Sequence, residues 1–216
     1  MVAPDQPSDD PLPAGPFAPW LDGMQRALAG GQGTDVPCGT CTACCTSGQF
    51  VHIHPDEADT LAHIPHELLF PAPFLPTGHV LLGYDERGHC PMLADGKCSI
   101  YAYRPRTCRT YDCRVFPASG LTDRDKPPIA ARAARWEFDV TGQDAERRLA
   151  AVQAAGAFLS EYPEVFPDGA PPPNRTQLAV LAVELHEEFL EASPSVDLIR
   201  TALLALQRRA LSDLGC

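Results

Sequence analysis

Eight cysteines gathered in one segment limit what this sequence can fold into. They lie between Cys38 and Cys113 of a 216-residue chain, and the ninth cysteine is the final residue, Cys216. Cysteines that only fill a hydrophobic core are scattered along a sequence, so this crowding indicates thiols that act together. Two chemistries use thiols in this way, namely disulfide bonding and metal coordination.

The redox compartment separates these two chemistries. The first residues, MVAPDQPSDDPLPAGP, have neither the basic start nor the apolar stretch of a secretory signal. The sequence also has no run of about 18 apolar residues, the length needed to span a membrane. We therefore expect the protein in the cytoplasm, where thiols stay reduced and clustered cysteines usually bind metal.

The first cysteine group is Cys38-Gly-Thr-Cys41-Thr-Ala-Cys44-Cys45. Three cysteines at intervals of three form a tight loop whose sulfurs can converge on one small inorganic group. Bacterial ferredoxins use this spacing for three corners of a 4Fe-4S cluster, and a remote cysteine followed by proline completes such runs. Cys90, which precedes Pro91, matches that remote position.

The second cysteine group is Cys90, Cys98, Cys108 and Cys113, and it brings the candidate metal ligands to eight. Thiolate-only sites suit both iron–sulfur clusters and zinc, and the ferredoxin-like spacing favours a 4Fe-4S cluster with zinc as the alternative. Adjacent side chains diverge, so Cys44 and Cys45 can serve different centres, and the eight thiols can build one centre or two. The predicted metal ligands are Cys38, Cys41, Cys44, Cys45, Cys90, Cys98, Cys108 and Cys113.

The charge pattern excludes some partners and adds candidate residues. The net charge of −11 argues against binding to nucleic acid or to anionic lipid, because both need a basic surface. Residues 97–114 are nevertheless basic, with five Lys and Arg against a single acid. Guanidinium groups stabilise an anionic cluster, so we predict that Arg104, Arg106 and Arg109 bind the cofactor. The alternative is that they pair with carboxylates or face solvent.

The rest of the chain divides into three parts by composition. We expect a disordered, proline-rich tail at 1–16, a cysteine-cluster metal-binding domain at 17–120, and a helical part at 121–216 that packs on the same domain. The predicted fold class is irregular α+β, in which a metal-stapled region with short β-hairpins packs against three or four α-helices. The C-terminal helices offer a docking surface for an unknown protein partner.

Periodicity and turn residues predict the individual elements. Thr141, Asn174 and Ser193 are the expected caps of the last three helices. Three histidines, His52, His54 and His89, are weaker candidates for contact with the thiols. We predict helices at 17–30, 55–63, 142–162, 174–192 and 194–213, a short helix opened by Pro105, a strand at 50–54, irregular chain at 65–77, a hairpin of 79–84 with 89–93, and a turn at 94–96.

Two blocks of the sequence, CGTCTACC and GHCPMLADGKCSIYAYRPRTCRTYDCR, together resemble a known family. They are similar to the YkgJ-type cysteine-cluster proteins, described as zinc- or iron-chelating domains, whose signature is CxxCxxCC followed by a second cysteine block. The resemblance covers about residues 36–116, includes all eight clustered cysteines, and extends to Gly96, Ile100, Tyr101, Arg104, Pro105 and Arg109. It implies metal chelation.

A flagellin lysine N-methylase carries a similar cysteine block, which implies that some relatives are enzymes. This chain is short for such an enzyme, and it lacks the glycine-rich strand–turn–helix signature of a methyl-donor site. Catalytic residues therefore stay unassigned. We expect a metal centre with a structural, electron-transfer or redox-sensing role; the alternatives are a cluster-containing enzyme related to the methylase and a zinc-stabilised partner-binding or metal-delivery module.

Overall fold

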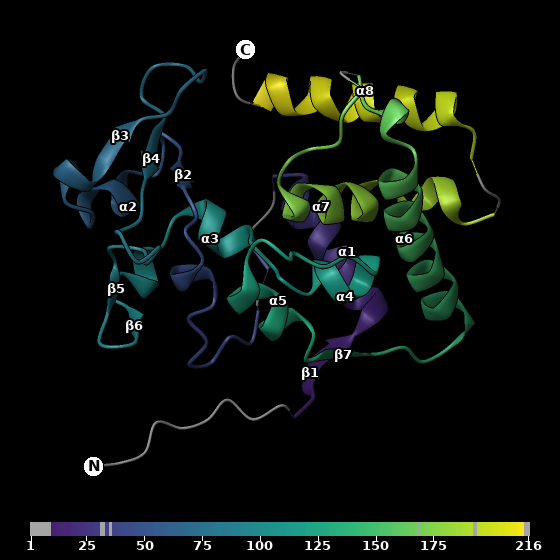
Figure 1. Ribbon diagram of the computed structural model, residues 1–216, viewed down its shortest axis with the longest axis horizontal. Coiled ribbons are helices and arrows are strands. Elements are labelled where there is room, and N and C mark those ends of the chain that lie inside the picture. The colour runs from purple at the N-terminus through teal and green to yellow at the C-terminus, as the bar shows by residue number, and fades with distance from the viewer. Residues whose placement is uncertain (1–9, 31–32, 35, 168, 192–193, 214–216) are drawn as a thin grey trace.

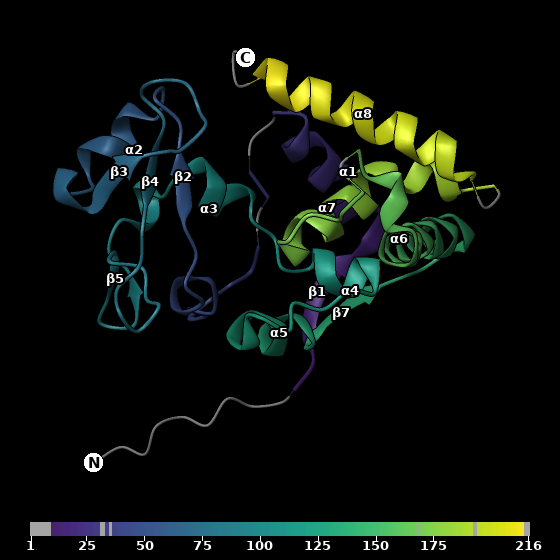
Figure 2. The ribbon, with the colours of Figure 1, turned by 45° about the horizontal axis from the view of Figure 1, so that its top comes forward.

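A computed structural model describes residues 10–30, 33–34, 36–167, 169–191 and 194–213. Residues 211–213 are described without their side chains. Short strands and small helices gather in one part of the molecule, and longer helices form another (Figure 1). This arrangement confirms the predicted irregular α+β class. Turning the view keeps the two parts apart, with α3 (Arg106–Thr110) between them (Figure 2).

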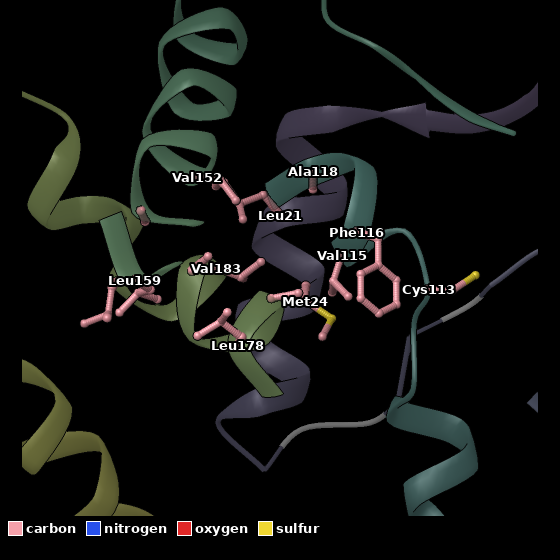
Figure 3. Packing of buried hydrophobic residues seen from close by; sticks show 14 of the residues in the cluster. Leu21, Met24, Cys113, Val115, Phe116, Ala118, Val152, Leu159, Leu178 and Val183 are labelled. Atoms are coloured by element: carbon pink, nitrogen blue, oxygen red, sulfur yellow. The ribbon is translucent and has the colours of Figure 1, made fainter. Parts of the chain in front are cut away.

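The helices of the larger part surround the main hydrophobic core. Phe17, Leu21 and Met24 of the first helix are fully buried, because their spacing puts them on one face. They pack with side chains such as Val152 and Leu178 (Figure 3). The helices of this part are α1 (Phe17–Leu28), α4 (Val115–Ser119), α5 (Pro127–Ala133), α6 (Gln143–Glu161), α7 (Arg175–Leu185) and α8 (Val196–Asp213).

A two-stranded parallel ribbon joins the start of the described chain to its middle. β1 (Leu12–Pro16) pairs with β7 (Trp136–Asp139), with Leu12 opposite Trp136. The predicted disordered tail is therefore wrong for residues 12–16, because Ala14 is buried and the strand finds a partner that the local composition does not reveal. Residues 1–9 of that tail lie outside the described residues.

The smaller part contains a three-stranded antiparallel sheet in the order β2 (Val51–Ile53), β4 (Val80–Leu82), β3 (Leu69–Pro71). The predicted hairpin of 79–84 with 89–93 is wrong, since β4 pairs with β2 and β3 instead. The expected irregular stretch supplies β3, whose one proline, Pro71, is tolerated because β3 is an edge strand. Next to the sheet lie α2 (Ala58–Ala62) and the small hairpin of β5 (Leu93–Ala94) with β6 (Lys97–Cys98).

The helix ends show which sequence signals operate. Asn174 accepts a hydrogen bond from the backbone N–H of Thr176, as predicted for the cap of α7, but that helix ends at Leu185 rather than near residue 192. Gly142, not Thr141, occupies the cap position of α6. The predicted cap Ser193 lies outside the described residues. No helix in the described part of the chain is both long and apolar enough to cross a membrane.

Candidate metal centres

The first cysteine group forms a compact loop held by backbone hydrogen bonds. The backbone N–H of Cys41 donates to the carbonyl of Cys38 at 2.9 Å, and Gly39 between them adopts a left-handed conformation with φ of 56°. Cys44 and Cys45 then open a single 3₁₀ turn, Cys44–Thr46. The three-residue spacing thus produces two consecutive turns, which place four thiols in a short stretch of backbone.

The second group approaches the first loop from the smaller part of the molecule. The backbone N–H of Cys90 donates to the carbonyl of Cys45 at 2.7 Å, which ties the two groups together directly. Cys98 lies on β6, opposite Leu93 of the small hairpin, and Cys108 lies on α3. The hairpin and the helix thus carry two further thiols of the smaller part of the molecule.

Cys113 belongs to the helical part. It is 7% exposed and borders the main core, with its sulfur directed away from Val115 and Phe116 (Figure 3). The indole N–H of Trp136 donates to this sulfur at 3.2 Å. Cys108 lies on α3, whereas Cys113, only five positions later in the sequence, follows the end of that helix.

Mutual electrostatic influence divides the eight thiols into two sets of four. Burial raises the pKa of Cys44 well above its ordinary value. The negative charges of the neighbouring thiolates of Cys113, Cys38 and Cys41 raise this pKa further, in that order. Burial likewise raises the pKa of Cys113 to about 12, with Cys38 and Cys41 as further causes. The first thiol set is therefore Cys38, Cys41, Cys44 and Cys113.

The remaining four thiols influence one another in the same way. The pKa of Cys108 is raised to about 12. Burial is the largest cause, and the charges of Cys90, Cys45 and Cys98 act in the same direction. Burial also raises the pKa of Cys45 to about 11, and Cys90 and Cys98 act on it more strongly than any thiol of the first set. The second thiol set is Cys45, Cys90, Cys98 and Cys108, so the adjacent residues Cys44 and Cys45 fall into different sets.

The three predicted cofactor-binding arginines occupy different surroundings. Arg106 forms an ion pair with Asp56 at 2.9 Å, and Arg109 lies 3.6 Å from a carboxylate oxygen of Glu57. Both thus engage carboxylates of the smaller part. Arg104 covers the ring of Tyr101, and its charge lowers the pKa of thiols in both sets, against the stronger effect of burial.

Sequence reasoning missed two residues beside the first thiol set. Arg132 on α5 donates to the carbonyl of Cys38 at 3.4 Å and opposes the burial that raises the pKa of that thiol. Trp136 on β7 donates to the sulfur of Cys113. Both lie well past the last clustered cysteine, and no spacing signal connects them to it.

The histidine candidates make other contacts. His52 shares a hydrogen bond with His79, with the ring nitrogens 2.8 Å apart, and His54 pairs with Asp56. The backbone N–H of His89 donates to Asp85. None of the hydrogen bonds found for these three histidines reaches a thiol of the described residues.

The donor chemistry of both sets fits a thiolate-bound metal. The eight clustered cysteines are free thiols, and four thiolates are the ligand set of structural zinc and of iron–sulfur clusters. Within the part of the chain that the structure describes, no three or more His, Cys, Asp or Glu side chains are already arranged as ligands of a single metal ion. Binding at either set therefore requires its thiols to turn toward a common point.

The thiol-bearing segment also matches a known family. Residues 37–126 match the CxxCxxCC family, described as "Putative zinc- or iron-chelating domain". The match covers less than half of the chain and confirms the resemblance expected from the two cysteine blocks. Neither a curated protein nor a solved structure matches the chain. The CxxCxxCC domain contains both thiol sets, while Arg132 and Trp136 lie beyond its end.

Proposed function

We propose that this protein binds metal at two adjacent thiolate centres, one formed by each thiol set. The observation that supports this is the division of eight clustered thiols into two sets of four by their mutual influence. Among the thiols, Cys44 and Cys45 are each influenced more strongly by members of their own set than by members of the other, as two neighbouring centres would require. Cys44 and Cys45 hold the centres next to each other, since adjacent Cα atoms are about 3.8 Å apart.

The occupant that we favour is an iron–sulfur cluster, with zinc as the alternative. The first thiol set has the ferredoxin-like arrangement of three cysteines at intervals of three plus one remote cysteine. In this arrangement Cys113 takes the remote position that the Cys90–Pro91 step had suggested for Cys90, and Cys90 belongs to the second set. Such centres would stabilise the fold, transfer electrons or sense the redox state, and a reducing compartment such as the cytoplasm would keep their thiols available.

Metal analysis of protein purified without oxygen tests the proposal. We expect iron and acid-labile sulfide in amounts that account for two centres, with visible charge-transfer absorption. A colourless protein with two equivalents of zinc would keep the two-centre function and overturn the iron assignment. One equivalent of zinc, or iron and sulfide for one cluster only, would overturn the two-centre function.

Single substitutions locate the two centres independently. Cys41→Ala and Cys98→Ala should each remove the metal of one centre, because each deletes one of four ligands. Cys216→Ala is the matched control, since the ninth cysteine lies outside both sets, and it should keep the full metal content. Loss of all metal in both variants would show a single shared centre instead.

A further inference from the structure

Two side-chain nitrogen donors, from Trp136 and Arg132, lie beside the first thiol set. The indole N–H of Trp136 donates to the sulfur of Cys113, and the Trp136 side chain is buried at 5% exposure. The guanidinium of Arg132 lies over the indole ring, with its central carbon 4.7 Å from the ring centroid. One side of the first thiol set is thus covered by an indole N–H and a positive charge.

Arg132 has a donor with no acceptor of its own. Its Nη2 donates to the backbone carbonyls of Pro37 and Cys38, at 3.5 and 3.4 Å, and so fixes the guanidinium against the start of the thiol loop. Its Nε–H is buried and finds no hydrogen-bond acceptor among the described residues. A buried, unsatisfied N–H group costs free energy, and an anionic sulfur beside it would supply the missing acceptor.

The second thiol set has one hydrogen-bond donor of its own, the backbone N–H of Met92, which favours the thiolate of Cys90. Arg104 acts on thiols of both sets and so does not distinguish them. The carboxylate of Asp112 disfavours the thiolates of Cys38 and Cys113, but it is paired with Arg114. The side-chain donors that distinguish the first set from the second are therefore Arg132 and Trp136.

We propose, on the basis of the two-centre function above, that Arg132 and Trp136 are positioning residues that make the first thiol set the tighter metal centre and the first to fill. Hydrogen bonds to ligand sulfurs and nearby positive charge stabilise thiolates and orient them. Both residues lie outside the CxxCxxCC match, so the helical part of the chain, rather than the cysteine domain, sets the order of filling.

Two single-centre backgrounds separate the contributions. Cys98→Ala leaves the first thiol set as the only complete one, and Cys41→Ala leaves the second. Metal-free protein of each background is titrated with Co²⁺ alone, and thiolate-to-metal charge-transfer absorption reports binding. We expect tighter binding in the Cys98→Ala background. Adding Arg132→Met and Trp136→Phe there should weaken binding roughly 10- to 100-fold, with a change within about twofold in the Cys41→Ala background.

The controls distinguish an electrostatic role from a structural one. Arg132→Lys keeps the positive charge and should recover part of the lost affinity, whereas Arg135→Met, three positions further along the chain, should leave it unchanged. Circular dichroism checks that the fold survives. Equal losses in both backgrounds, or tighter binding by the second set, would overturn the inference alone. Absence of Co²⁺ binding in both backgrounds would overturn the inference and the two-centre function together.

Discussion

The side chain of Asp112, one residue before Cys113, joins α1 to the segment that precedes α4. Its carboxylate accepts hydrogen bonds from the indole N–H of Trp20 and from the guanidinium of Arg114, and both members of this ion pair are buried. Asp112→Asn would leave the Arg114 charge buried without its carboxylate, which should lower the free energy of unfolding by about 3 kcal/mol. Denaturant unfolding measures this. As the control, Asp144→Asn breaks an exposed ion pair with Arg147 and should cost less than about 1 kcal/mol, and equal effects would contradict the argument.

The thiols predict how the metal-free protein responds to pH. Burial raises the pKa of Cys45 from 9.0 to about 11, and those of Cys108 and Cys113 to about 12. At a pH between 9.0 and about 12, the folded protein retains thiol protons that the unfolded chain releases, so higher pH favours unfolding. Stability of the metal-free protein should therefore hold up to about pH 9 and fall above it. Urea unfolding at several pH values under reductant checks this, and stability that increases above that pH would refute it.

At the scale of elements, close packing between α4 and α6 depends on one glycine. A Cβ atom at Gly156 would lie 2.4 Å from the backbone oxygen of Ser119, whereas a Cβ at Gly23 of α1 meets nothing closer than 3.8 Å. Gly156→Ala should therefore destabilise the protein by about 1–3 kcal/mol by forcing the helices apart. Gly23→Ala should stabilise it by up to about 1 kcal/mol through helix propensity. Thermal unfolding of the two variants should shift in opposite directions.

The sequence correctly predicted the elements that depend on interactions between neighbouring residues. Helix α1 begins at Phe17 as its apolar spacing predicts, and Asn174 caps α7 because a side-chain oxygen can reach the first free N–H groups. The pairing of β4 with β3, and of β1 with β7, depends on residues far apart in the chain. For the same reason the sequence identified eight clustered thiols but not which of them influence one another most, such as Cys113 and Cys44, which are far apart in the chain.

At the scale of the whole molecule, two hydrophobic clusters of unequal size meet at the thiols. The main cluster draws on α1, α4 and α6 to α8 and on both strands of the parallel ribbon. The buried part of the smaller cluster is only Ile53, Ile64, Leu82 and Ile100. So small a core cannot offset the conformational entropy of the surrounding loops, and a bound metal would supply the missing stabilisation.

Metal removal should therefore affect the two parts unequally. A chelator added under reductant should expose the backbone amides of β2 to β6 and α3 to rapid hydrogen exchange, while α6 and α7 stay protected by the main cluster. Mass spectrometry of the exchanged peptides resolves the two regions, and Cys98→Ala should produce the same pattern without a chelator. Loss of protection throughout the chain would mean that the first thiol set also maintains the helical part. That result is physically reasonable only if Cys113 and Trp136, which border the main core, lose their positions together with the metal.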